Sequence, residues 1–75
     1  MILPDKYIPL EETYLGLGWR ALRLLERPQT VNSLWRQMKD IPEVASYQRF
    51  ILTLDFLFLL HAIELGDDLL LRRCT

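Results

Sequence analysis

The pattern of apolar residues near the C-terminal end predicts one long helix over residues 46 to 64, with two apolar faces. At about 100° per residue, one face carries Tyr47, Phe50, Leu54, Leu57 and His61, and the opposite face carries Leu52, Phe56, Leu59 and Ile63. Only one of these faces can pack on the core of a small domain. The other must be covered by the segment that follows, by another protein, or by both. This excess of apolar surface indicates a small helical interaction module.

An earlier helix is predicted over residues 11 to 26, where the apolar positions again follow helical spacing. Gly18 lies in the middle of the apolar face, at a cost of about 1 kcal/mol relative to alanine. We therefore expect another backbone or a large ring to approach closely at this position. Trp19 lies at the edge of the same face, and both an exposed interface residue and a core rim are open interpretations of it.

A second, short helix is predicted after the break at residues 27 to 29, with Thr30 as its cap. Its core face follows i, i+3, i+4, i+7 spacing and consists of Val31, Leu34, Trp35 and Met38. Residues 40 to 45 read as a turn, after which Ser46 is expected to cap the long helix.

The last residues alternate between apolar and polar, which predicts a β-hairpin. A loop formed by residues 66 to 68 places four apolar side chains on one face, namely Ile63, Leu65, Leu69 and Leu71. Residues 28 to 31 are candidates for a short third strand. At the other end, residues 1 to 10 contain two prolines and predict an extended arm.

The predicted fold class is therefore α+β, mostly α. We expect a single small winged helix-turn-helix domain over residues 11 to 75, with three helices and a C-terminal β-hairpin, preceded by the extended N-terminal arm of residues 1 to 10. An all-helical bundle with a frayed tail is the alternative, and the alternating tail counts against it.

Composition narrows the classes of function. The chain has 75 residues and a formal net charge of -1, without the cationic excess that non-specific phosphate binding usually needs. Its single cysteine, Cys74, forms no internal disulfide, which suits a reducing cytoplasm. No signal peptide is recognised, and the longest apolar run, residues 56 to 60, is far shorter than the roughly 20 residues that cross a bilayer. We expect a cytoplasmic protein without a membrane partner.

Residues for catalysis or for a cofactor are scarce. His61 has no histidine or cysteine neighbour at metal-ligand spacing, so a buried, hydrogen-bonded histidine is the favoured interpretation. Asp67 and Asp68 read as a solvated loop, and Gly16 and Gly18 lack the strand and lysine of a phosphate loop. The sequence predicts no enzyme, no metal and no cofactor.

Binding to DNA is the main competing function, because many winged helices lay their third helix in the major groove. Here that helix offers a single arginine, Arg49, and the acidic loop of residues 66 to 68 is expected to repel phosphates. The candidate DNA contacts lie instead on and after the first helix, at Arg20, Arg23 and Arg27.

Three segments together carry a family resemblance: LPDKYIPLEETYLGLG, then RPQTVNSLWRQM, then SYQRFILTLDFLFLLHAIELGDDLLLRR. The chain resembles the small middle component of bacterial ABC-three component systems, in particular middle component 6, over nearly its whole length. The resemblance implies an accessory subunit encoded beside an SMC- or Rad50-like ABC ATPase and a third component, in systems that defend against phages or plasmids. The Lamassu complexes are a related arrangement, and the winged-helix kite subunits of SMC complexes are a structural analogy.

We therefore expect a non-catalytic subunit that docks an SMC-like ABC ATPase and couples it to an effector. The candidate partner-binding residues lie in the arm and on the long helix: Leu3, Pro4, Asp5, Lys6, Tyr7, Ile8, Arg49, Phe56 and Leu59. Burial of Phe56 and Leu59 under the hairpin is the alternative for those two side chains. A small DNA-binding regulator, contact with DNA only inside the complex, and a homodimer also stay open.

Overall fold

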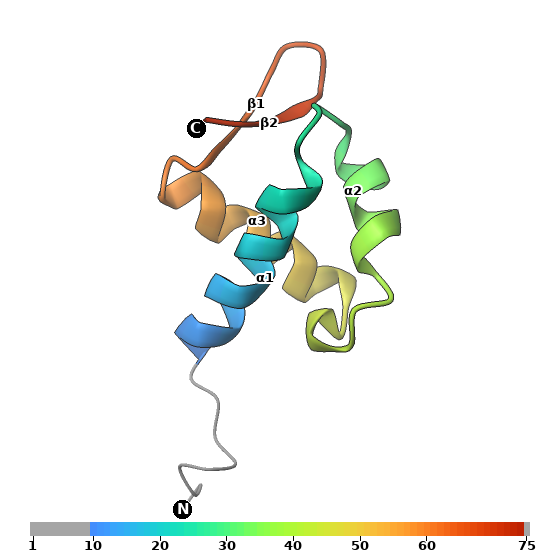
Figure 1. The fold of residues 1–75 in the computed structure, drawn as a ribbon, viewed down its shortest axis with the longest axis vertical. Coiled ribbons are helices and arrows are strands. Elements are labelled where there is room, and N and C mark those ends of the chain that lie inside the picture. Colours follow the sequence, from blue (N-terminus) through green and yellow to red (C-terminus); the bar gives the residue numbers. More distant parts are fainter. Residues whose placement is uncertain (1–9, 75) are drawn as a thin grey trace, which may run out of the picture.

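Three helices and a C-terminal hairpin follow one another in the computed structural model, which describes residues 10–74 and the side chains of residues 14–74 (Figure 1). The elements are α1 (Leu10–Leu24), α2 (Val31–Met38), a 3-10 turn η1 (Pro42–Val44), α3 (Tyr47–Leu59), β1 (Ile63–Leu65) and β2 (Leu71–Arg73). The predicted α+β, mainly helical class is confirmed. The order of the elements is that of a winged helix-turn-helix, and this finer assignment stays a prediction.

The two predicted helix caps are present. The Thr30 hydroxyl oxygen accepts a hydrogen bond from the Ser33 amide at 3.1 Å, and the Ser46 hydroxyl oxygen accepts one from the Arg49 amide at the same distance. Each cap satisfies a backbone N–H that has no partner inside the first turn of its helix. The sequence therefore located the starts of α2 and α3 correctly.

The first helix begins one residue earlier than predicted, at Leu10, so the last residue assigned to the arm is helical. The helix ends at Leu24, and the Leu25 amide still donates to the carbonyls of Ala21 and Leu22 at 3.1 and 3.2 Å. Residues 1–9 and 75 lie outside the described part of the chain.

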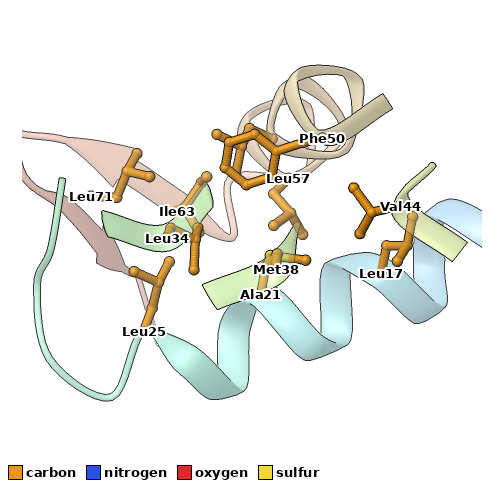
Figure 2. Close-up of a cluster of buried hydrophobic side chains, with 11 residues drawn as sticks. Leu17, Ala21, Leu25, Leu34, Met38, Val44, Phe50, Leu57, Ile63 and Leu71 are labelled. Atoms are coloured by element: carbon orange, nitrogen blue, oxygen red, sulfur yellow. The ribbon is translucent and has the colours of Figure 1, made fainter. Parts of the chain in front are cut away.

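The core lies where the three helices and the hairpin meet (Figure 2). Its buried apolar side chains come from every element: Leu17, Ala21, Leu25, Leu34, Met38, Val44, Phe50, Leu54, Leu57, Ile63 and Leu71. On α2 the predicted core face is confirmed, with Leu34 and Met38 fully buried and Val31 and Trp35 half-buried. These positions match the helical spacing, because one stripe of a short helix faces the interior.

Gly18 is buried and closely approached, as its position predicted, but the neighbour is neither a backbone nor a ring. A Cβ atom at Gly18 would lie 2.9 Å from the Cδ2 atom of Leu57 on α3. The absence of a side chain on α1 therefore leaves the space into which Leu57 packs.

The predicted helix over residues 46 to 64 is too long, because α3 ends at Leu59. His61 takes a left-handed conformation with φ 57°. Its amide donates to the Phe58 carbonyl at 3.0 Å, and the Ala62 amide donates to the Leu57 carbonyl at 2.9 Å. These two bonds form the Schellman motif that ends many helices. His61 is consequently exposed, and its predicted burial on an apolar stripe is wrong.

The hairpin has a longer loop than predicted. Leu65 pairs with Leu71, so residues 66 to 70 connect the strands, and the three-residue loop is wrong. Leu69 adopts a left-handed conformation with φ 65°, which removes it from the strand and leaves its side chain exposed at the tip. The predicted third strand is a single antiparallel bridge, in which Gln29 and Leu71 exchange both backbone hydrogen bonds.

Candidate interaction surface

Exposed apolar side chains of α3 form one wall of a groove against α1. The groove has a volume of about 290 Å³ and is lined by Tyr14, Leu52, Asp55, Phe56 and Leu59; we call it the α1–α3 groove. Leu52 is 45% exposed and Leu59 is 78% exposed, while Phe56 is partly buried. The hairpin does not bury Leu59, so the alternative that this residue is covered by it is wrong.

The groove exists because the opposite face of α3 supplies the core. Phe50, Leu54 and Leu57 are buried there, together with Thr53. The Thr53 hydroxyl donates to the Arg49 carbonyl at 2.9 Å, so this buried polar group is satisfied inside its own helix. The predicted second face is confirmed in part: the described residues leave Leu52 and Leu59 exposed, whereas Ile63, assigned to the same face, begins β1 and is buried in the core.

Arg49 shares the face of Phe56, because seven residues are nearly two helical turns. It lies about 10 Å from Phe56 along the helix axis, toward the start of α3. Its guanidinium Nη1 donates to the Glu43 carbonyl in η1 at 3.3 Å. Arg49 is half-buried and does not line the α1–α3 groove, so its predicted place at the rim of a docking surface stays a prediction.

The candidate arm residues, Leu3 to Ile8, lie outside the described residues. The structure therefore neither brings them to the α1–α3 groove nor separates them from it. Their assignment as partner-binding residues stays a prediction.

The candidate DNA contacts divide between two neighbouring hollows. Arg20 and Arg23 line one of about 380 Å³, and Arg27 lines the next. Glu26 lines both hollows, which lowers the local positive potential that a phosphate would meet. The structure thus places Arg20 and Arg23 together, but in a surface of mixed charge.

A second apolar groove lies between α2 and the hairpin, and the sequence did not predict it. It has a volume of about 470 Å³ and is lined by Thr30, Val31, Asn32, Arg36, Tyr47, Leu65 and Leu69; we call it the α2–hairpin groove. The prediction missed it because Leu69 was assigned to the strand face shared with Ile63.

Asp68 of the hairpin loop pairs with Arg72 of β2. Arg72 donates to both carboxylate oxygens of Asp68, and the Leu70 amide donates to the same side chain at 3.2 Å. These hydrogen bonds, the one from Arg72 first, hold the pKa of the Asp68 carboxyl below its usual value. The Asp68 carboxylate therefore forms a structural ion pair with Arg72.

Two further features of residues 10–74 concern metal binding and the membrane. In this range no cluster of three or more histidine, cysteine, aspartate or glutamate side chains is placed to hold a metal ion. None of the helices described there has the length and apolar character needed to cross a membrane.

One comparison with known proteins identifies the family of the chain. The sequence profile of the family described as ABC-three component (ABC-3C) system Middle Component 6 matches residues 3–74. Comparison with curated proteins found no significant match, and comparison with solved structures found none either. The family match covers nearly the whole chain and agrees with the resemblance seen in its sequence. The chain therefore belongs to the Middle Component 6 family of ABC-three component systems.

Proposed function

We propose that this chain is a non-catalytic middle subunit that docks an SMC-like ABC ATPase through the α1–α3 groove and couples it to an effector. The complex would act in defence against phages or plasmids. Membership of a middle-component family supports a role as a subunit. The observation that carries the docking proposal is the exposed Leu59, beside Leu52 and Phe56 on a face that the described residues do not cover.

Folding leaves part of the apolar surface of α3 unburied. Fully burying a leucine is worth about 1.5–3 kcal/mol relative to leaving it in water. In the isolated domain Leu59, which is 78% exposed, gains little of this, and Leu52, which is 45% exposed, gains only part of it. A partner that covers the groove would bury both side chains and the outer part of Phe56. Interface centres are enriched in aromatic side chains such as Phe56, and the residues around them contribute by excluding water.

The test uses two neighbouring leucines. Leu59 lines the α1–α3 groove, whereas Leu60, which is 54% exposed, does not. The tagged chain is co-expressed with the ABC ATPase of its own system, and the complex is measured by size-exclusion chromatography with mass determination. We expect Leu59→Asn to weaken the complex at least tenfold and Leu60→Asn to leave it unchanged. Equal behaviour of the two variants would refute the proposed surface.

A second candidate is contact with DNA, which the proximity of Arg20 and Arg23 favours. Either the free subunit binds duplex DNA as a regulator, or the assembled complex contacts DNA with help from these two arginines. Both versions predict that binding weakens steeply with salt and that neutralising both arginines reduces the salt dependence. Titration of duplex DNA into the free chain and into the complex distinguishes them. The same mass determination reports whether the free chain is a homodimer.

A further inference from the structure

The α2–hairpin groove contains a leucine that folding does not explain. Leu69 is 68% exposed and has φ 65°, a conformation that glycine and asparagine adopt far more easily than leucine. Its amide donates to the Gly66 carbonyl at 2.9 Å, a bond that any residue except proline would make. The leucine side chain thus costs stability through its backbone and gains little through burial. Residues held in such conformations cluster at functional sites.

The remaining apolar walls of this groove are held in place. The Tyr47 ring makes an edge-to-face contact with Trp35, with ring centroids 5.0 Å apart and planes at 88°. Leu65 is 49% exposed and is fixed by its pairing with the buried Leu71. A ligand would therefore meet a pre-formed apolar surface, which lowers the entropic cost of binding.

The charge of the groove indicates what kind of segment would fit it. Arg36 is the only ionisable side chain among the described lining residues apart from the Tyr47 phenol. The first turn of α2 carries no acidic residue, so the partial positive charge of the helix start is not neutralised there. The nearby Asp68 carboxylate is already paired with Arg72, and Asp67 of the same loop does not line the groove. The groove therefore favours apolar side chains accompanied by a carboxylate.

We propose that the α2–hairpin groove is a second docking surface, which binds an apolar, carboxylate-bearing segment of a second partner protein. It shares no lining residue with the α1–α3 groove, so a ligand in one groove does not occupy the contacts of the other. The proposal rests on the role as a subunit, but not on the α1–α3 groove being the ATPase site.

The test uses a substitution that separates binding from folding. Leu69→Asn removes the apolar contact and replaces leucine with a residue that tolerates a left-handed backbone, so the melting temperature should stay the same or rise. Arg36→Glu reverses the charge of the groove. Ala45→Gly is the matched control, because Ala45 likewise has a positive φ, of 64°, but does not line the groove. The probes are the ABC ATPase and the third component of the same system, each purified and titrated onto the immobilised full-length chain.

We expect Leu69→Asn and Arg36→Glu each to weaken binding of one of these two proteins at least tenfold, and Ala45→Gly to bind both normally. The protein whose binding these two variants weaken should be the one that the Leu59→Asn variant still binds normally. The proposal is overturned if both variants bind both proteins as the wild type does, if they lose the same protein as Leu59→Asn, or if only self-association changes. If Leu59→Asn binds normally while Leu69→Asn does not, the α1–α3 proposal fails and this one stands.

Discussion

Two glycines in α1, two residues apart, should respond to alanine in opposite directions. At Gly16 an added Cβ atom would meet, within 4 Å, no described atom beyond its own stretch of helix, whereas at Gly18 it would lie 2.9 Å from Leu57 Cδ2. In both cases alanine lowers the conformational entropy of the unfolded chain and favours the helix by about 1 kcal/mol. Only Gly18→Ala also forces a buried neighbour to move.

The size of the opposing effect follows from the packing around Leu57. That side chain is 3% exposed, so it cannot swing into solvent to make room. Inserting a methyl group into a packed core usually costs about 1–3 kcal/mol. After the helical gain of about 1 kcal/mol is subtracted, Gly18→Ala should lower the free energy of unfolding by about 1 kcal/mol. Gly16→Ala should raise it by about the same amount.

The assay is thermal and urea unfolding followed by circular dichroism. For a domain of this size, a difference of about 2 kcal/mol between the two variants separates their melting temperatures by roughly 8–16 °C. Leu57→Ala supplies a control, because it costs about 2–5 kcal/mol alone but opens the space beside Gly18. In that background Gly18→Ala should become stabilising. Equal stabilisation by Gly16→Ala and Gly18→Ala in the wild-type background would show that the close contact with Leu57 is wrong.

Three further predictions concern helix ends and the hairpin loop. Ser46→Ala should lower the free energy of unfolding by about 1 kcal/mol, measured by urea titration, because it removes the cap of α3; an unchanged midpoint would contradict this cap. His61→Gly should raise the melting temperature, because glycine occupies the left-handed position after a helix without the cost of a side chain, and a lower melting temperature would count against the Schellman motif. Asp68→Asn should remove the ion pair with Arg72. Because this pairing lowers the folded-state pKa of Asp68, its stabilisation is present above the ordinary carboxyl pKa of 3.8 and is lost as pH falls through the folded-state pKa. The difference in stability between the wild type and Asp68→Asn should therefore shrink in acid, and a difference that grows below pH 3.8 would refute the pairing.

Helix starts and core faces could be predicted from the sequence because local rules determine them. Thr30 and Ser46 each precede an apolar stripe and supply the side-chain oxygen that a first helical turn lacks. The buried positions Leu34 and Met38 of α2, and Phe50, Leu54 and Leu57 of α3, follow from helical spacing, since one stripe of each helix must face the interior. Tyr47, predicted for the same stripe of α3, is 47% exposed. The second apolar face of α3 was predictable on the same ground, but its exposure and the α1–α3 groove were not.

Helix ends and strand register depended on contacts between distant parts of the chain. Nothing local forbids the helix from continuing past Leu59, and a histidine rarely marks the left-handed position where α3 stops. The pairing of Leu65 with Leu71 is supported by the bridge from Gln29, which lies 42 residues before Leu71 in the sequence. Local alternation favoured a shorter loop, and it therefore assigned Leu69 to the wrong place.

The sequence by itself determined the class of fold, the caps, the faces that form the core, and the family. Only the tertiary structure decided which apolar side chains stay exposed and which of them lie together. Spacing along a helix or strand fixes the direction of a side chain relative to its own element. The neighbours of that side chain depend on how elements cross. Gly18 therefore meets Leu57, and Leu69 joins Tyr47 in a groove, through packing that no local pattern records.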